Sequence, residues 1–470
     1  MVIWSASDAA RATGGRATQA FNATGLCADL SHLAVGEMYI AFDPILARSA
    51  LDSGAGAVLC TDIPPDCTEG DPLLVVEDLT AALCAMARSV RGAMTARVVA
   101  IAGSLGKSTA LSMLSAVLRP CEAPVETIEA VTLNGLALRL AHMGAISGVL
   151  AVELDPVDPA ELLPLARLLA PDYIFLTATP GAHVEELAAC ARCAILPATS
   201  GTSAPRDVTA PDPTGCGQSA GGCRVRYGSS DGCNPQLIST RLSQDVTVIE
   251  ARMRVNEIEV PRFLMKVRHP APQIGLIALG VLALAQMCGA DLATAVLDLG
   301  QWEPPEGQGA RDRIYMDIVD ANATFDLFDV TSEHNESLAA MVSDLATLCA
   351  ARPRDGVGRV RRGRRIAILG GDAPLPVALA AHPVLARIDR VHVFGAGGLA
   401  LWEGLGNSKR GEWRKDVVDL VDRVPHLLDA GDVVMVRGTG HSRAGKIVDA
   451  LRKLGQSGAA EAHGAKLGKE

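Results

Sequence analysis

A short glycine-containing turn, Gly103-Ser104-Leu105-Gly106-Lys107-Ser108-Thr109, holds the residues best suited to chemistry in this chain. It follows a β-branched and small apolar run, and it precedes a segment whose apolar spacing predicts a helix. Glycines let backbone N–H groups approach anionic oxygens, and a helix N-terminus adds partial positive charge. Lys107 can neutralise a terminal phosphate, and the Ser108 hydroxyl can hold a magnesium ion. The turn therefore predicts a site for ATP and Mg²⁺, formed by Gly103, Ser104, Gly106, Lys107, Ser108 and Thr109.

The spacing of this turn departs from the common phosphate-binding loop. That loop has a glycine five residues before its Gly-Lys pair, and Ile101 stands at this position here. The alternative interpretation is a plain glycine turn between a strand and a helix, with a solvent-facing lysine.

Composition restricts the class of protein. A chain of 470 residues is too long for one core, so we expect three domains. No apolar run reaches membrane-spanning length, and the start of the chain lacks a basic stretch followed by an apolar core, so we expect a soluble, cytoplasmic protein, and a monomer. The net charge of −10 argues against a nucleic-acid partner. We interpret the seven arginines between Arg352 and Arg365 as part of a solvated linker.

Twelve cysteines occur in the chain, and we expect most of them to be small core residues. A Cys-x-x-Cys pair, Cys190 and Cys193, is followed by Cys216, Cys223 and Cys233. These residues leave a zinc site as an alternative, although no second Cys-x-x-Cys completes it.

The pattern of apolar runs predicts an α/β protein. In residues 1–95 we expect strands at 38–42, 57–60 and 73–76 and a helix at 79–90. In residues 96–308, alternating strands and helices predict a parallel sheet with its ligand site at the carboxyl ends of the strands. A β-rich section at 246–267 and an apolar helix at 274–287 follow, after a loop expected between Thr199 and Pro235.

A third domain is expected at residues 309–455. Strands at 365–369, 390–394 and 432–436 separated by helices predict a small Rossmann-like unit. The polar, Ala- and Gly-rich segment 456–470 is expected to be a disordered tail.

These motifs and the three-part plan resemble the Mur ligases, and most of all the branch that joins D-alanyl-D-alanine to UDP-MurNAc-tripeptide in peptidoglycan synthesis. Segments 24–29, 35–42 and 53–59 resemble the uridine-nucleotide domain of that family. The family usually has Asp-Ser-Arg where this chain has Asp29-Leu30-Ser31, so an arginine expected near the nucleotide is missing.

The resemblance implies metal ligands and catalytic residues in the central domain. Glu153, at the end of a strand, and His183, after the next expected strand, would converge on one magnesium site with Ser108, at the carboxyl ends of adjacent strands. The family's asparagine after Thr177 is Ala178 here. The essential lysine, which the family carries as a carbamate, aligns with Arg192, whose guanidinium is a poor substitute.

The resemblance also implies residues that contact the nucleotide. His269 and Gln273 stand where the family holds adenine, Arg311 follows the expected hinge, and Asp329 keeps a carboxylate of a family motif. Arg437 replaces a lysine near the end of the chain.

Three hypotheses for the function follow, in order of preference. The first is the peptidoglycan enzyme, an ADP-forming ligase that activates a UDP-linked peptide carboxylate as an acyl phosphate and joins it to an amine co-substrate. The second is a Mur-type ligase with another carboxylate acceptor, for instance in cofactor assembly, which the changed first-domain motif suits. The third is a non-catalytic relative that binds ATP or a partner, which the arginine at position 192 suits.

Overall fold

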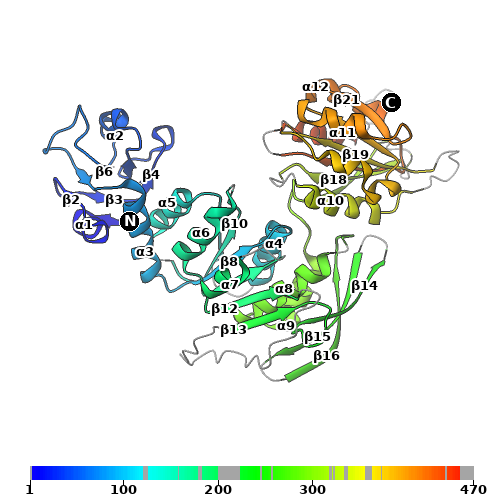
Figure 1. The fold of residues 1–470 in the computed structure, drawn as a ribbon, viewed down its shortest axis with the longest axis horizontal. Helices are drawn as coiled ribbons and strands as arrows, with labels where there is room; N and C mark the ends of the chain where they lie inside the picture. Colours follow the sequence, from blue (N-terminus) through cyan, green and yellow to red (C-terminus); the bar gives the residue numbers. More distant parts are fainter. Residues whose placement is uncertain are drawn as a thin grey trace, which may run out of the picture. The chain divides into compact units, whose positions relative to one another are not determined.

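The computed structural model describes residues 3–119, 125–144, 146–156, 158–177, 183–198, 223–243, 246–255, 258–271, 273–316, 320, 323–332, 337–354, 362–371, 373–439 and 442–455. The chain forms two compact units, whose helices and strands are labelled in Figure 1. Unit 1 comprises Met1–Gly103, Leu118–Arg226 and Leu284–Ala290, and unit 2 comprises Ser104–Val117, Tyr227–Ala283 and Asp291–Glu470. The predicted boundaries 1–95, 96–308 and 309–455 stay a prediction. The predicted tail, 456–470, lies outside the described residues.

The first part of unit 1 is built on a small sheet with the strand order β2-β7-β6-β5-β4. Strands β4 to β7 are parallel, and β2 pairs with β7 in the antiparallel sense. The strands are β2 (Arg16–Ala17), β4 (Leu26–Cys27), β5 (Met38–Ile40), β6 (Ala57–Cys60) and β7 (Leu73–Val75), and a separate pair is formed by β1 (Trp4–Ser5) and β3 (Asn22–Ala23). Every residue of β5 and β6 is buried, as expected for strands that helices cover on both faces.

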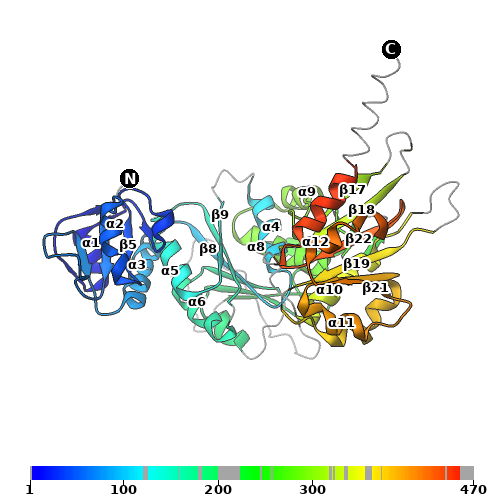
Figure 2. The same cartoon turned by 90° about the horizontal axis from the view of Figure 1, so that it is seen from above.

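Three helices accompany this sheet: α1 (Ala6–Thr13), α2 (Ala47–Asp52) and α3 (Leu79–Ala93) (Figure 2). The side chain of Ser5 caps α1 by accepting from the Asp8 N–H, and Asp78 caps α3 in the same way at Ala81. These caps explain where the two helices begin. The predicted helix at 79–90 is confirmed and runs three residues further.

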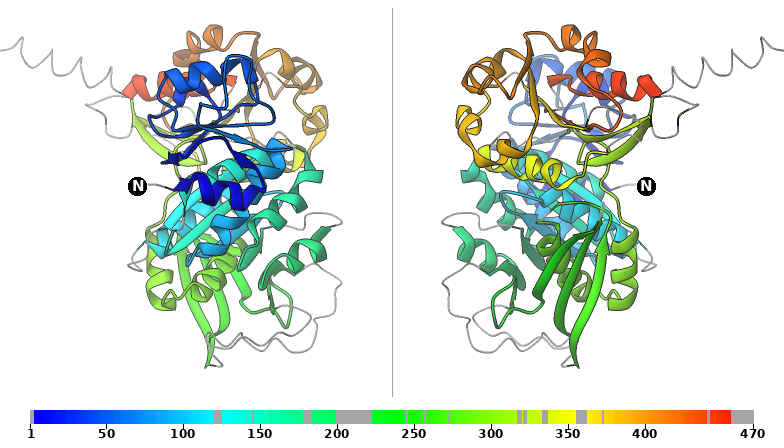
Figure 3. Two further views of the ribbon diagram at one scale, coloured as in Figure 1. Left: turned by 90° about the vertical axis from the view of Figure 1, so that its left-hand side faces the viewer. Right: turned by 90° about the vertical axis from the view of Figure 1, so that its right-hand side faces the viewer.

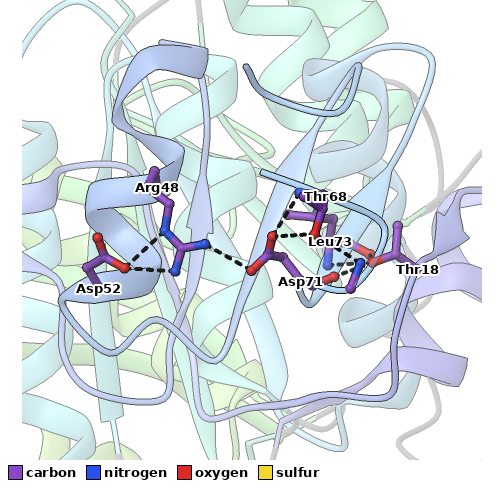
Figure 4. A network of polar contacts seen from close by, with 7 residues as sticks. Thr18, Arg48, Asp52, Thr68, Asp71 and Leu73 are labelled. Atoms are coloured by element: carbon purple, nitrogen blue, oxygen red, sulfur yellow. Dashed lines mark hydrogen bonds and ion pairs between the residues drawn. The ribbon is translucent and has the colours of Figure 1, made fainter. Parts of the chain in front are cut away.

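A polar network fixes the loop that leads into β7 (Figure 4). Arg48 of α2 binds Asp52 and, at 3.0 Å, Asp71. Asp71 also accepts from the N–H and hydroxyl of Thr68, and hydrogen bonding to this backbone N–H lowers its pKa. The hydroxyl of Thr18 donates to the Asp71 carbonyl at 2.5 Å. The loop is thereby bound on one side to α2 and on the other to the segment after β2.

A six-stranded sheet forms the second part of unit 1, with the order β13-β12-β11-β8-β10-β9. The pairs from β12 to β9 are parallel, as the alternating pattern predicted. The strands are β8 (Arg97–Ala102), β9 (Val125–Ala130), β10 (Val149–Leu154), β11 (Tyr173–Leu176), β12 (Cys193–Pro197) and β13 (Cys223–Tyr227), and the helices beside them are α5 (Leu133–Met143), α6 (Leu162–Leu169) and α7 (Val184–Ala189). Strand β13 corrects the prediction of a loop throughout 199–235; residues 199–222 lie outside the described residues.

The two parts of unit 1 meet at the end of α5. The indole N–H of Trp4 donates to the carbonyl of Ala141 at 3.0 Å. The Nδ1 atom of His142 lies 2.9 Å from the carbonyl oxygen of Leu26 in β4. Alternate side chains of β8 and β10 enter a core that is shared with α3, α5 and α6.

Unit 2 begins with a three-stranded antiparallel sheet, β14 (Gln236–Ser243), β15 (Val246–Val255) and β16 (Ile258–Val267), seen at the bottom of the right-hand view in Figure 3. Its buried face carries Ile249, Ala251, Met265 and Val267. Helix α9 (Leu292–Gln301) packs on β16, and Gly275 of α8 (Ile274–Met287) lies against Thr240 and Ile249. Helix α4 (Lys107–Leu118) belongs to the same unit.

The rest of unit 2 is a six-stranded sheet with the order β17-β18-β22-β19-β20-β21, parallel except for β17. The strands are β17 (Ala310–Tyr315), β18 (Thr324–Val330), β19 (Arg365–Gly370), β20 (Arg390–Phe394), β21 (Arg410–Arg414) and β22 (Val433–Arg437). Helices α10 (Leu338–Ala350) and α11 (Leu399–Gly404) cover one face, and α12 (Val417–Val421), α13 (Val424–Leu427) and a helix at 445–455 cover the other (Figure 2). No helix in the described part of the chain is long and apolar enough to cross a membrane.

Candidate functional site

The glycine turn joins β8 to α4 as predicted, because β8 ends at Ala102 and α4 begins at Lys107. Gly106 has a positive φ of 74°, and a Cβ atom there would lie 2.5 Å from Cδ1 of Ile277 in α8. Both the left-handed backbone and this close approach require glycine. The Gly106 carbonyl accepts from Ala110 N–H and so begins the helix.

Lys107 is the first residue of α4 and is only 6% exposed. Ser108 and Thr109 follow it and are half-buried. A lysine at a helix N-terminus adds a full charge to the partial charge of the helix, and together they favour a phosphate group. The plain-turn alternative required a solvent-facing lysine, so the burial of Lys107 counts against it.

Trp302 anchors the middle of α4. Its indole N–H donates to the hydroxyl of Ser112 at 3.0 Å, and the ring itself is buried. Trp302 follows α9 directly, so the contact fixes α4 against the segment that leads to the predicted hinge.

His269 lies in an aromatic cluster beside this segment. Its ring stands edge-on to Trp302, with centroids 6.4 Å apart, and edge-on to Phe328, at 6.5 Å. Burial, with a smaller contribution from the charge of Arg311, lowers the pKa of His269 to about 4. The imidazole is therefore neutral at pH 7.

Gln273, the second residue predicted to contact adenine, already has a partner within unit 2. Its amide nitrogen donates to the hydroxyl of Ser343 in α10 at 2.6 Å. Its side chain therefore connects the start of α8 to the C-terminal sheet, and the nucleotide contact stays a prediction.

Arg311 lies on β17, stacked 5.4 Å above the ring of Phe328. Its guanidinium donates to the buried carboxylate of Asp326 at 2.5 Å. Arg313 binds the other oxygen of Asp326 at 3.1 Å, and Arg354 approaches to 3.5 Å. Among the described residues, the one carboxylate of Asp326 thus accepts hydrogen bonds from three arginines.

Asp329 is buried at the end of β18. It accepts a hydrogen bond from the Thr331 hydroxyl at 2.6 Å, and the guanidinium of Arg452 lies 3.4 Å away. The Asp329 carbonyl accepts from Gly309 N–H at 2.6 Å, so the predicted hinge is bonded directly to this residue.

Arg437, where the family has lysine, is buried at the end of β22 and donates to Asp344 of α10 at 2.7 Å. Burial raises the pKa of Asp344, although the nearby Arg437 opposes this effect. The pair ties the central strand of the sheet to the helix that covers it.

In unit 1, Glu153 lies near the carboxyl end of β10 and is 4% exposed. It is level with Ile101 of β8 and with Glu129 of β9. This is the edge of the sheet at which the phosphate turn leaves β8, so the position predicted for Glu153 along the strand is confirmed.

His183 lies beyond β11 and before α7, and its side chain is 57% exposed. Its Nδ1 is 2.5 Å from a carboxylate oxygen of Glu186. The expectation that Glu153 and His183 follow adjacent strands is wrong, because β8 lies between β10 and β11. Residues 178–182, which include Ala178, lie outside the described residues.

The placement of Arg192 corrects its assignment to the carbamate position. Arg192 precedes β12, and Asp172, which precedes β11, lies 3.4 Å from its guanidinium. Register places Cys193 and Tyr173 level with Val99, close to the amino end of β8. Parallel strands put all their carboxyl ends on one edge, so Arg192 lies at the opposite edge from the phosphate turn, with its side chain 86% exposed.

The donor chemistry fits magnesium at two of the three predicted ligands. Ser108 and Glu153 offer the oxygen atoms that magnesium prefers, whereas His183 offers nitrogen and is paired with Glu186. Within the described ranges, no group of three or more His, Cys, Asp or Glu side chains could hold a metal. The zinc alternative therefore has no support there, and Cys216 lies outside those ranges.

Several residues of the site were missed by sequence reasoning. Trp302 and Phe328 enclose His269, and Asp326 binds Arg311. The available signal was a charged residue, Asp326, between the apolar residues Phe325 and Leu327 of a strand that is buried throughout. A buried carboxylate needs a cationic partner, and Arg311 and Arg313 alternate on the strand before it.

No protein-family model and no curated protein sequence matches the chain. Solved structures do match it along almost its whole length. A MurF structure from Acinetobacter baumannii has 15% identity and a TM-score of 0.69, covering 96% of this chain and 99% of its own. MurF ligase from Thermotoga maritima in complex with ADP has 16% identity and a TM-score of 0.69, covering 92% of this chain and 98% of its own.

A more distant likeness is the UDP-N-acetylmuramate-alanine ligase MurC from Thermotoga maritima, with 14% identity, a TM-score of 0.53 and coverage of 86% of this chain and 85% of its own. Identities this low carry information on architecture alone. The chain therefore has the three-domain α/β fold of the Mur ligases, which the resemblance of its sequence implied.

Proposed function

We propose that the chain is an ATP-dependent, ADP-forming amide ligase of the Mur type. The observation that carries this proposal is the turn between β8 and α4, with buried Lys107 at the first position of the helix. Further support comes from the fold, since one structure with a TM-score of 0.69 is a MurF ligase in complex with ADP.

In this mechanism, an acceptor carboxylate attacks the γ-phosphate of ATP and forms an acyl phosphate, with ADP as leaving group. Lys107 and the backbone N–H groups at the start of α4 stabilise the negative charge that spreads over the phosphate oxygens. Ser108 and Glu153 would hold magnesium, which supplies further charge neutralisation when bound. An amine then attacks the acyl carbon, the C–O bond breaks, and amide and phosphate result.

For the substrates, we propose UDP-MurNAc-tripeptide as acceptor and D-alanyl-D-alanine as amine, which makes the chain a peptidoglycan precursor ligase. The fold is closer to the MurF structures, at a TM-score of 0.69, than to MurC, at 0.53. A different carboxylate acceptor is the second candidate. The observation that favours it is Asp29, which accepts from Ser31 N–H and binds His32, where the family would have an arginine two residues after the aspartate.

The argument for the third hypothesis, a non-catalytic module, no longer applies. That argument was the replacement of a catalytic lysine by Arg192. Because Arg192 lies at the opposite edge of the sheet from the phosphate turn, its identity says nothing about turnover.

The test is ADP release by the purified chain with ATP, Mg²⁺ and a panel of acceptors and amines. We expect release that requires both UDP-MurNAc-tripeptide and D-alanyl-D-alanine and that EDTA abolishes. Release with another acceptor only would favour the second candidate, and no release with any pair would contradict ligase activity.

Lys107→Ala is the informative variant, because it removes the charge directed at the phosphates. We expect it to abolish ADP release and weaken ATP binding in calorimetry, while the circular dichroism spectrum stays unchanged because alanine is a good helix former at the first position of α4. Lys266→Ala is the matched control, since this lysine is exposed on β16. Equal ATP affinity in the Lys107→Ala variant and the unmodified chain would rule out the proposed phosphate site.

A further inference from the structure

Two cysteines of unit 1 meet at the edge of the six-stranded sheet, away from the residues of the proposed ligase. Cys193 begins β12 and Cys223 begins β13, and the two strands are neighbours. The N–H of Cys223 donates to the carbonyl of Arg192, the residue before Cys193, at 3.0 Å. This backbone bond places Cys193 and Cys223 side by side on the two strands, and both thiols are free.

This geometry suits a disulfide. Neighbouring strands lie about 4.8 Å apart, and disulfides join Cα atoms about 4.4 to 6.8 Å apart. Because backbone pairing already places the two residues side by side, a bond between their sulfur atoms requires only side-chain adjustment.

The two thiols differ in their surroundings. Cys193 is buried and Cys223 is half-buried, so an oxidant in solution reaches Cys223 first. The hydrogen bond from Cys193 lowers the pKa of Cys223, although burial opposes this effect. The same hydrogen bond, together with burial, raises the pKa of Cys193. Cys223 is therefore the nucleophile, and Cys193 is the thiol positioned to resolve its product.

We propose that Cys223 and Cys193 are a redox pair that a low-molecular-weight disulfide, such as glutathione disulfide, converts to an intramolecular disulfide. The Cys223 thiolate attacks one sulfur of the oxidant and releases one thiolate, which takes up a proton. Cys193 then attacks the Cys223 sulfur of the mixed disulfide, loses its proton, and releases the second thiol. Two cysteine thiols are oxidised, and one small disulfide is reduced to two thiols.

The bond would tie β13 covalently to β12 and close the chain between residues 193 and 223 into a loop. The chain enters unit 2 at Tyr227, the last residue of β13. The proposal is independent of the ligase activity, so either can fail without the other.

Thiol counting and peptide mapping test the proposal on the full chain. The protein is equilibrated with glutathione disulfide, quenched with acid, alkylated and digested with trypsin. We expect the count of free thiols to fall by two, and peptide 193–206 to be linked to peptide 207–224. Fragmentation places the bond at Cys223 rather than at Cys216, which lies in the same peptide.

Single substitutions provide the controls. Cys193→Ser and Cys223→Ser should abolish the linked peptide. Cys190→Ser and Cys216→Ser should retain it, since the Cys190 thiol donates instead to the Glu186 carbonyl at 3.3 Å. A bond between Cys190 and Cys193, a bond that includes Cys216, or an unchanged thiol count would overturn the proposal.

A second measurement tests the roles of the two thiols. The rate of Cys223 alkylation by iodoacetamide should rise at lower pH than that of Cys190, whose pKa burial raises. Cys193→Ala removes the donated hydrogen bond, so alkylation of Cys223 at pH 7 should slow several-fold. An unchanged rate in this variant would contradict the assignment of Cys223 as the activated thiol.

Discussion

His269 is the functional candidate whose chemistry its surroundings change most. Two aromatic rings lie beside it, and burial together with the nearby charge of Arg311 lowers its pKa to about 4. A neutral imidazole packs against Trp302 and Phe328 without an unpaired charge. At pH 7 the imidazole is therefore uncharged and keeps one N–H, so it can donate a hydrogen bond but does not act as an acid.

The lowered pKa of His269 predicts a loss of stability in weak acid. The unfolded chain takes up a proton near pH 6.5 and the folded chain only near pH 4, so protons favour unfolding between these values. The free energy of unfolding should fall by about 3 kcal/mol over this window for each such histidine, and His392 behaves alike. Urea unfolding at several pH values measures this, and His269→Gln should flatten the profile. A similar flattening in His426→Gln, an exposed control, would contradict the assignment.

Asp326 predicts a second effect at the scale of one residue. Asp326→Asn would remove the negative charge that Arg311, Arg313 and Arg354 share. We expect a loss of about 3 kcal/mol in the free energy of unfolding, measured by urea denaturation.

Asp312→Asn is the matched control for this change. Asp312 lies on the neighbouring strand and pairs with Arg452 at 2.8 Å, but its side chain is 35% exposed. Its replacement should cost about 1 kcal/mol or less. Equal losses in the two variants would show that Asp326 has no special part in holding the arginines.

The positions of site residues next to a clear local sequence signal were predictable. The positions of residues that contacts between distant segments determine were not. The apolar pattern marks the ends of β8 and β10, so the position of Lys107 after β8 and that of Glu153 near the end of β10 were found. The prediction for Arg192 was wrong because the number of residues between it and a motif does not tell whether it precedes or follows a strand. The partners of His269 come from segments that only the folded chain brings together.

At the scale of elements, the turn into α4 depends on the fit between Gly106 and α8. A Cβ at position 106 would collide with Cδ1 of Ile277, and the positive φ adds backbone strain. Gly106→Ala should lower the free energy of unfolding by about 2 kcal/mol and weaken ATP binding. Ile277→Val removes the colliding atom.

A double-mutant cycle separates the two causes. The double variant Gly106→Ala/Ile277→Val should lose about 0.5 to 1 kcal/mol less free energy of unfolding than the two single variants lose together. The loss that remains reflects the positive φ at position 106. Strict additivity of the two substitutions in urea denaturation would show that Ile277 does not limit the turn.

The contact between β22 and α10 provides the second prediction for elements. Arg437→Met would leave Asp344 without its cation, and we expect a loss of about 2 kcal/mol. Adding Asp344→Leu should restore most of the loss, because an apolar pair replaces the ionic one. A double variant as unstable as the single one, in thermal or urea unfolding, would indicate that the arginine acts by shape rather than by charge.

The apolar pattern predicted several elements with their bounds, where an uninterrupted apolar run marks the element. The expected strands at 57–60 and 390–394 and the helix at 274–287 have those bounds in the structure. Strand β13 was missed because it directly follows a Gly- and Ser-rich segment and its side chains are mostly half-buried. The strand forms because its backbone pairs with β12, and no local sequence pattern indicates this pairing.

At the scale of the whole molecule, the net charge predicts that this chain does not bind nucleic acids. The net charge is −10, and the arginines around Asp326 and Asp432 are paired with carboxylates. Fluorescence anisotropy with duplex DNA at about 50 mM salt should show no binding. Binding that weakens steeply with added salt would contradict this prediction and direct attention to the segment from 352 to 365.

The positions of the four tryptophans allow fluorescence to follow the two units separately. Trp4 is the single indole of unit 1, and it donates to Ala141 where the two parts of that unit meet. Trp302, Trp402 and Trp413 belong to unit 2, and Trp302 stands beside His269. With the other three replaced by phenylalanine, emission from Trp4 would follow the opening of unit 1 alone. Emission from Trp302, in a second such variant, would dim as the imidazole beside it gains a proton, so its fluorescence would report the charge of His269.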